Sequence, residues 1–144
     1  MWWFNALDQY TEAAGDKADN KFVKEQYTAL KDVVKHHMYG RMTADELEQQ
    51  NPLMKGIVKK GQGKLPVGDG NSGIGMDKDG LITADDGQLT WMDSAKWDPQ
   101  AKKSHPYTPR DGKAVEINAL WYNGLRIMSK LADKFGEKEE SKQY

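Results

Sequence analysis

Three segments of the sequence carry apolar side chains at every third or fourth position, which is the repeat of an amphipathic α-helix. They cover residues 2–14, about 19–40 and about 113–135, and each one ends at or just before a glycine. Glycine is the residue that most often follows the last turn of a helix. The pattern therefore predicts a mainly α-helical chain. Because only a short polar turn separates the first two segments, we expect them to form a helical hairpin.

The same spacing predicts which side of each helix faces the core. Asp19 or Asn20 is expected to cap the second helix, because a side-chain oxygen at that position accepts a hydrogen bond from a free backbone N–H. The expected core residues are Trp3, Leu7, Tyr10 and Ala14 in the first helix; Val23, Tyr27, Leu30, Val34 and Met38 in the second; and Ile117, Leu120 or Trp121, Gly124, Met128, Leu131 and Phe135 in the third.

The chain between the second and third helices has a different composition. Residues 43–46 form a capping box, which predicts a short helix that ends before Pro52. From Gly61 onward the sequence is rich in Gly, Lys, Asp and Ser and shows no period. We therefore expect residues 41–75 to be a Gly- and Lys-rich loop insertion.

Three further segments are expected to be short or irregular. Residues 76–82 predict a tight turn between two short extended pieces. Residues 83–112 contain three prolines and are expected to be irregular, and long loops of this kind in a compact domain usually carry a function. The charged tail, residues 137–144, is expected to be frayed.

Charge and composition exclude several classes of protein. The 144 residues include 21 basic and 22 acidic side chains, so the net charge of -1 gives no electrostatic reason to bind nucleic acid. No apolar run approaches the roughly 18 residues that span a bilayer, and the start of the chain lacks the basic and apolar regions of a signal peptide. The chain has no cysteine, hence no disulfide and no thiolate metal site. We expect a cytoplasmic protein with no cofactor, no metal and no membrane partner.

Two short motifs have the spacing of a ligand site but the wrong context. Residues 68–73 fit the pattern G-x-G-x-x-G. No helix is expected after them, although a dinucleotide site requires one, so a loop is the better interpretation. Asp77 and Asp79 resemble the opening of a calcium-binding loop, but two later ligand positions hold Leu81 and Gln88. A calcium-stabilised loop is the weakest of the functional alternatives.

The stretch from residue 89 to residue 122 combines residue types that bind sugars. An aromatic ring stacks on the C–H face of a pyranose, while carboxylate, amide and guanidinium groups hydrogen-bond its hydroxyls. Acid-catalysed cleavage of a glycoside also needs carboxyl groups on both sides of the bond. The alternative is structural: the tryptophans are core aromatics, and the arginine and glutamate form an ion pair. The residues concerned are Trp91, Asp93, Arg110, Glu116, Asn118 and Trp121.

Two blocks in this stretch are similar to a known family. The first is Leu-Thr-Trp-Met-Asp, which ends at Asp93. The second is Thr-Pro-Arg-x-Gly-Lys-x-Val-Glu-Ile-Asn-Ala-Leu-Trp-Tyr-Asn, at residues 108–123. In this order and at nearly this gap, they resemble the C-terminal amylo-α-1,6-glucosidase region of glycogen debranching enzymes. The resemblance covers most of the chain except about residues 41–73, which look like an insertion.

The resemblance implies both a fold and an activity. The fold is an (α/α)6 toroid, in which helical hairpins surround a pocket built from their connecting loops. Residues 1–144 would be part of such a domain. The activity is hydrolysis, with inversion, of the single α-1,6-linked glucose at a branch point of glycogen or limit dextrin. The implied partner is thus an α-glucan.

Roles for individual residues also come from the resemblance. It implies that Asp93 is the general acid, and burial beside Trp91 and Met92 would raise the pKa of that carboxyl. Glu116 and Asn118 would shape the glucose pocket. The remaining expected contacts are Arg110 with a carboxylate or sugar hydroxyls, Trp121 by packing or stacking, and Trp3 in the part similar to the hairpin before this loop.

The resemblance places the family's general base beyond the end of this sequence. The chain is therefore expected to carry the general-acid loop without the base, and Asp111 and Glu116 are the nearest other carboxyl groups. The apolar faces of its helices would then be covered by self-association or by the remainder of the toroid. The alternative function is a non-catalytic, carbohydrate-binding helical module.

Overall fold

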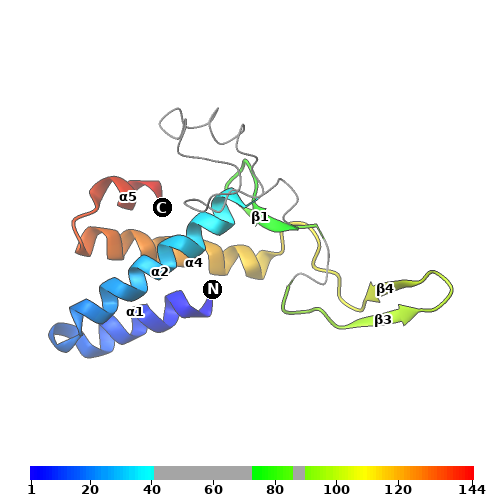
Figure 1. The fold of residues 1–144 in the computed structure, drawn as a ribbon, viewed down its shortest axis with the longest axis horizontal. Helices are drawn as coiled ribbons and strands as arrows, with labels where there is room; N and C mark the ends of the chain where they lie inside the picture. The colour runs from blue at the N-terminus through cyan, green and yellow to red at the C-terminus, as the bar shows by residue number, and fades with distance from the viewer. Residues whose placement is uncertain (41–72, 86–89) are drawn as a thin grey trace, which may run out of the picture. The chain divides into compact units, whose positions relative to one another are not determined.

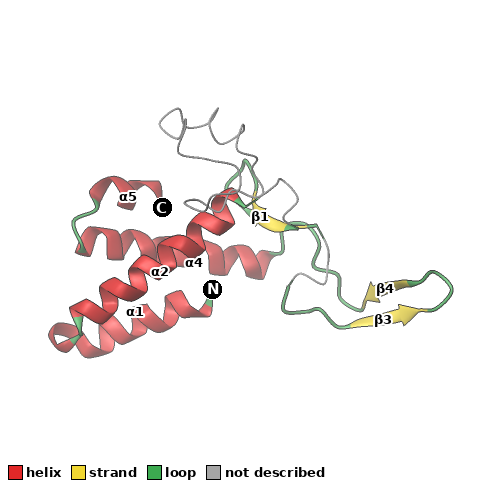
Figure 2. Ribbon diagram, viewed as in Figure 1, coloured by secondary structure: helices red, strands yellow, loops and turns green. Residues whose placement is uncertain are grey.

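The computed structural model describes residues 1–40, 73–85 and 90–144, and the chain is mainly helical (Figures 1 and 2). It divides into two units, which we describe separately: residues 1–34 with 118–144, and residues 35–117. The helices are α1 (Trp2–Ala14), the 3-10 turn η1 (Gly15–Lys17), α2 (Asn20–Tyr39), α4 (Val115–Lys134) and α5 (Lys138–Gln143). The strands are β1 (Ile74–Met76), β2 (Ile82–Ala84), β3 (Ala95–Asp98) and β4 (Lys103–Pro106).

Several of the sequence predictions fall outside the described residues. They are the capping box at residues 43–46 with the short helix expected after it, the glycine motif except for Gly73, most of the loop insertion at residues 41–75, and the first residue of the Leu-Thr-Trp-Met-Asp block. Within the described ranges, no helix is both long enough and apolar enough to cross a membrane.

The three long helices confirm the prediction made from apolar spacing, with ends within two residues of those expected. α1 and α2 form the expected hairpin through η1 (Figure 1). Asp19 caps α2: its Oδ1 accepts hydrogen bonds from the backbone N–H of Lys21 at 2.9 Å and of Phe22 at 3.1 Å. These bonds satisfy two of the backbone donors that the first turn of a helix leaves without a partner.

The core of the first unit is formed by one face of each long helix. The predicted face of α2 is confirmed except for Met38, which is half-buried, and that of α4 is largely confirmed. The predicted face of α1 is partly wrong, because Phe4 is buried while Trp3 and Tyr10 are 43% and 37% exposed. The buried residues are Phe4 and Leu7 in α1; Val23, Tyr27, Leu30 and Val34 in α2; and Trp121, Gly124, Ile127, Met128, Leu131 and Ala132 in α4.

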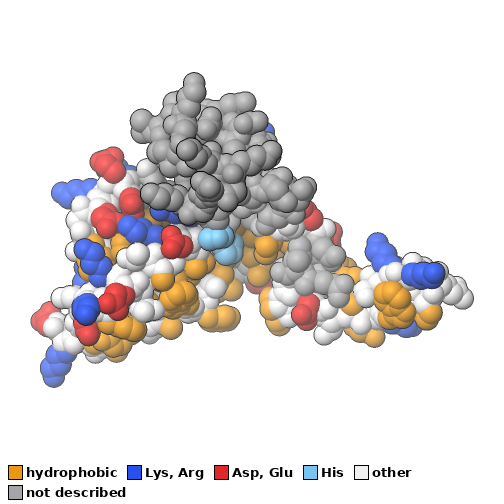
Figure 3. All heavy atoms as spheres, in the orientation of Figure 1, with side chains coloured by type: hydrophobic (Ala, Val, Ile, Leu, Met, Phe, Trp, Pro, Cys, Tyr) orange, Lys and Arg blue, Asp and Glu red, His pale blue; other side chains and the backbone are white. Residues whose placement is uncertain are grey.

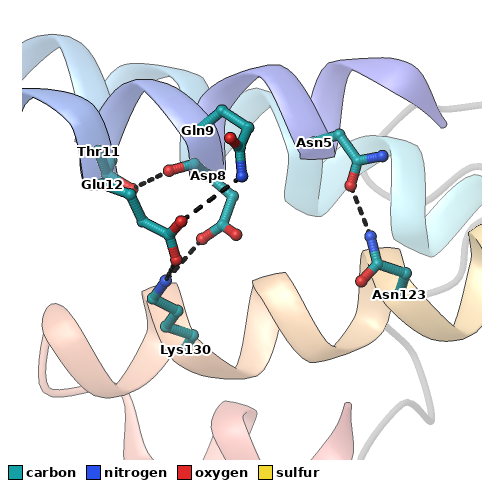
Figure 4. Close-up of polar contacts among 7 residues, drawn as sticks. All are labelled: Asn5, Asp8, Gln9, Thr11, Glu12, Asn123 and Lys130. Atoms are coloured by element: carbon teal, nitrogen blue, oxygen red, sulfur yellow. Dashed lines mark hydrogen bonds and ion pairs between the residues drawn. The ribbon is translucent and has the colours of Figure 1, made fainter.

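Polar pairs flank the apolar contact between α1 and α4 (Figure 4). The amide of Asn123 donates a hydrogen bond to Oδ1 of Asn5 at 2.5 Å. Two turns further along α4, the ammonium group of Lys130 reaches Asp8 at 2.8 Å and Glu12 at 2.9 Å. These two carboxylates are one turn apart on α1, so a single lysine bridges both.

Gly124 lies in the middle of α4, where the ring of Phe4 packs against it. A methyl group added at Gly124 would lie 3.5 Å from Cγ of Phe4, which is ordinary van der Waals contact. Alanine favours a helix by about 1 kcal/mol over glycine. We therefore expect Gly124→Ala to raise the free energy of unfolding by about 0.5–1 kcal/mol, measured by urea denaturation.

The matched control for Gly124→Ala is the same substitution just after α4. Gly136 has a φ of 77°, a left-handed conformation that alanine adopts with strain. Gly136→Ala should lower the free energy of unfolding by about 1 kcal/mol. A loss of stability in Gly124→Ala as well would mean that the Phe4 ring cannot accommodate the methyl group.

The charged tail is ordered as α5, so the expectation that it frays is wrong for residues 138–143. Glu137, just before α5, accepts a hydrogen bond from the buried Tyr27 hydroxyl at 2.9 Å and one from Lys31 at 2.8 Å. Lys31 also pairs with Glu140 at 3.2 Å. These contacts link residues more than 100 positions apart, so no local pattern could have indicated them.

The ion pair of Lys31 with Glu137 should make stability depend on acid pH. The hydrogen bond from Lys31 is the main cause that lowers the pKa of Glu137 below its usual 4.5. A lowered pKa in the folded state adds stability above about pH 4.5, and this stability is lost as pH falls through the lowered pKa. Glu137→Gln should therefore reduce stability at pH 7 by about 1 kcal/mol and flatten the acid side of the profile.

Urea denaturation from pH 3 to pH 8 measures this dependence. Glu139→Gln is the control, because Glu139 is on the same helix, its side chain is 85% exposed, and it pairs with the neighbouring Lys142. The control profile should follow that of the unmodified chain. If Glu137→Gln does so too, the contact of Glu137 with Lys31 does not hold α5 in place.

The described residues of the second unit form two antiparallel hairpins. In the first, β1 pairs with β2, with Met76 opposite Ile82, and the backbone N–H of Asp77 bonds the carbonyl of Leu81 at 2.8 Å. This confirms the predicted tight turn, in which Gly80 supplies a φ of 82°. The second hairpin pairs β3 with β4 at residues 95–98 and 103–106, so the expectation of irregular structure is wrong there.

Candidate functional site

Three of the residues expected to bind substrate meet at the start of α4. The Nε atom of Arg110 donates a hydrogen bond to Oε1 of Glu116 at 2.7 Å, and the Trp91 side chain hydrogen-bonds the same carboxylate. Trp91 is 69% exposed, so its indole remains open to a ligand. We call Trp91, Arg110 and Glu116 the arginine–glutamate cluster. It contains the ion pair that the structural interpretation of the sequence proposed.

Glu116 is held in its ionised form. It lies in the first turn of α4, where the backbone N–H groups and the positive end of the helix dipole favour a carboxylate. A hydrogen bond from its own backbone is the largest cause that lowers the pKa of Glu116, followed by the bond from Arg110. A carboxyl group with a lowered pKa has no proton to donate at neutral pH. Glu116 is therefore suited to accept hydrogen bonds and not to serve as a general acid.

The segment that carries Arg110 is tied to the first hairpin by its backbone. Ala84 and Gly112 exchange two backbone hydrogen bonds, at 3.0 and 2.7 Å. Gly112 has a φ of 75°, which a residue with a side chain adopts only with strain, so glycine suits this position. This bridge extends the edge of β2 and fixes the chain just before α4.

Lys113 adds a second tie to the same hairpin. Its ammonium group lies 3.1 Å from Oδ2 of Asp77 and 2.6 Å from Oδ2 of Asp79. The hydrogen bond from Lys113 lowers the pKa of Asp79. Asp77 and Asp79, which resembled the opening of a calcium-binding loop, thus form ion pairs with Lys113 in this structure.

Asp93, the expected general acid, lies between Trp91 and the second hairpin. It is exposed, like Trp91, so the expectation that Asp93 is buried beside Trp91 is wrong in this structure. The reason is local: the segment 90–94 has no regular structure, and both side chains lie at the surface of the unit. The backbone N–H of Tyr107 donates to the carbonyl of Ser94 at 3.0 Å, so Asp93 directly precedes the base of the β3–β4 hairpin.

The other three expected site residues belong to the first unit. Trp121 is 2% exposed and forms part of the core, which fits the packing role and not a stacking contact with substrate. Asn118 is half-buried on α4. Trp3 is 43% exposed and lines a surface groove of about 320 Å³ together with the aromatic rings of Tyr10 and Phe22.

A further surface with the chemistry of a sugar site was missed by the sequence analysis. The β3–β4 hairpin borders a hollow of about 580 Å³. Its lining combines an aromatic ring with basic, acidic and amide side chains: Lys96, Trp97, Asp98, Pro99, Gln100 and His105. The sequence signal was a tryptophan between two charged residues just before a proline-containing turn.

The comparison with protein families completes this evidence. The family model described as amylo-alpha-1,6-glucosidase matches residues 1–144. The chain therefore belongs to the amylo-α-1,6-glucosidase family, which confirms the resemblance to the C-terminal region of glycogen debranching enzymes. No curated protein and no solved structure gives a significant match.

Proposed function

We propose that this chain contributes to the hydrolysis of α-1,6-linked glucose at the branch points of glycogen or limit dextrin, with inversion. The observation that carries the proposal is the arginine–glutamate cluster, whose Trp91 is two residues before Asp93 in the sequence, in a chain of the amylo-α-1,6-glucosidase family. An exposed indole, a guanidinium group and a carboxylate are the groups that bind a pyranose through its C–H face and its hydroxyls. The substrate class is thus an α-glucan.

Asp93 is the general acid in this proposal. Its carboxyl proton goes to the glycosidic oxygen as the bond to the anomeric carbon breaks, while a water molecule attacks that carbon from the opposite face. A second carboxylate takes the proton from this water. Glu116 is an unsuitable base, because Arg110 and Trp91 already hydrogen-bond it and its lowered pKa makes it a weak proton acceptor. We assign Glu116 to substrate positioning and the base to a carboxylate outside the arginine–glutamate cluster.

The helical hairpin of α1 and α2, with α4, would form part of an (α/α)6 toroid. The support is the hairpin of α1 and α2 (Figure 1) and an apolar groove beside Trp3 that a further helix would cover. In a toroid, the loops between hairpins surround the pocket. Asp93 and the arginine–glutamate cluster are in such a loop and at its junction with α4.

A non-catalytic, glucan-binding module is the second candidate. The observation in its favour is the exposure of Asp93 and Trp91, because an exposed indole and an exposed carboxyl group can bind a sugar at the surface without an enclosed catalytic site. Such a module keeps the sugar contacts of Trp91 and Arg110 without hydrolysis.

One experiment separates the two candidates. Glucose release and binding are measured with a limit dextrin that carries single α-1,6-linked glucose branches, and linear amylose serves as the control. Glucose release from the limit dextrin, with none from linear amylose, supports the glucosidase function. Binding without release supports the glucan-binding module. A folded chain that neither binds nor cleaves the limit dextrin overturns both.

A further inference from the structure

The β3–β4 hairpin exposes aromatic rings. Trp97 in β3 is 57% exposed, and Tyr107, directly after β4, is 69% exposed. Exposed tryptophan side chains leave a large apolar area in water, and a cluster of them on a protein surface commonly marks a binding site. Figure 3 shows hydrophobic and basic side chains side by side over this hairpin.

Polar groups surround the ring of Trp97 at the hollow of about 580 Å³, a volume within the range of ligand sites. Asp98 is partly committed to the turn, since its Oδ1 accepts hydrogen bonds from the backbone N–H of Gln100 at 2.8 Å and of Ala101 at 3.1 Å. The ammonium of Lys96, the amide of Gln100 and the imidazole of His105 also line this hollow and can hydrogen-bond hydroxyls. Nε2 of His105 lies 4.0 Å from Oδ2 of Asp98.

The hairpin continues directly from the proposed catalytic loop. Asp93 is one residue before Ser94, whose carbonyl accepts the closing hydrogen bond from Tyr107, and Arg110 follows three residues after Tyr107. Both arms of the hairpin thus lead into residues assigned to the sugar site. A glucan bound to the hairpin would therefore be bound by residues that are close to Asp93 in the amino-acid sequence.

We propose that the β3–β4 hairpin is a second glucan-binding surface, which holds an α-1,4-linked chain of the branched substrate with Trp97 stacked on a glucose ring. This inference rests on the proposed function, because it takes the same α-glucan as ligand. An exposed ring at the border of an open hollow suits an extended glucan chain, because such a chain can lie across it with one glucose stacked on the ring. The ring supplies the stacking contact, and Gln100, Lys96 and His105 supply hydrogen bonds to hydroxyls.

Trp97→Ala in the full chain tests this proposal. The dissociation constant for maltoheptaose, a linear α-1,4 glucan, is measured by calorimetry, and glycogen binding is measured by co-sedimentation. Loss of one stacking contact should weaken binding about two- to tenfold. Trp97→Tyr should restore most of the affinity because it keeps an aromatic face. Binding should change little between 50 and 500 mM salt, since the ligand is neutral.

Trp2→Ala is the matched control, because Trp2 is 74% exposed but belongs to the first unit. The Trp2→Ala variant should bind maltoheptaose with the same affinity as the unmodified chain. If Trp97→Ala binds maltoheptaose as tightly as the unmodified chain does, the hairpin surface is refuted while the proposed function stands. If Trp97→Ala loses affinity and Trp97→Tyr loses as much, the proposed stacking of an aromatic ring on glucose is also refuted. If the unmodified chain binds neither glucan, the proposed function fails and this inference fails with it.

Discussion

Trp121→Ala is expected to lower the free energy of unfolding by about 3–5 kcal/mol, the range for removing a buried aromatic side chain. Trp121 is 2% exposed, in the face of α4 that forms the core of the first unit. Alanine would leave a cavity that the neighbouring side chains fill only in part, so both the transfer energy and the packing contacts of the indole are lost. Urea denaturation followed by circular dichroism measures the change.

The neighbouring residue provides the control for Trp121→Ala. Tyr122 is on the same helix but is 65% exposed, and Tyr122→Ala should change the free energy of unfolding by about 0.5 kcal/mol or less. Trp121→Phe should cost less than Trp121→Ala, because most of the buried volume remains. A Trp121→Ala chain with unchanged stability but weakened glucan binding would instead place Trp121 in contact with substrate.

The helices could be predicted because their signals are local. The spacing of apolar residues and the Asp19 cap lie within each segment, and the three long helices end within two residues of the expected positions. The face of α1 was harder, because Trp2, Trp3 and Phe4 are consecutive aromatics and successive residues differ by about 100° around a helix. Only packing against α4 decides that Phe4, and not Trp3, is buried.

The second hairpin could not be predicted because it lacks the usual signals. Its strands are only four residues long, apolar and polar residues alternate in β3 but not in β4, and its turn has no Asn-Gly or Asp-Gly pair. Lys102 adopts a φ of 48°, a conformation for which glycine is the usual choice. Backbone pairing across four residue pairs forms this hairpin, and composition does not reveal such pairing.

The candidate site was predicted in part. The ion pair of Arg110 with Glu116 was the structural alternative to sugar binding in the sequence analysis, and the structure contains it. The exposure of Asp93 did not follow, because burial depends on which elements cover the loop. The Leu-Thr-Trp-Met-Asp block contains Asp93 but gives no information on how exposed the Asp93 side chain is.

Asp93→Asn is expected to lower glucose release from a branched limit dextrin by about 10²–10⁴-fold, the usual contribution of a general acid. Asparagine keeps the size of the side chain and its hydrogen bonds but has no proton to give to the leaving oxygen. The affinity for the dextrin should therefore change little. Glucose release and dextrin binding are measured on the same preparations, and Asp133→Asn, at an exposed aspartate on α4, is the control with unchanged rate.

A substrate that needs no proton distinguishes the acid role from a positioning role. Fluoride leaves α-glucosyl fluoride with little help from an acid, so Asp93→Asn should hydrolyse this compound at close to the rate of the unmodified chain. If Asp93 only positions the sugar, both substrates lose rate equally, because the misplaced glucose reacts slowly whatever its leaving group. A selective loss of rate on the dextrin, with the rate on α-glucosyl fluoride kept, assigns the general-acid role to Asp93.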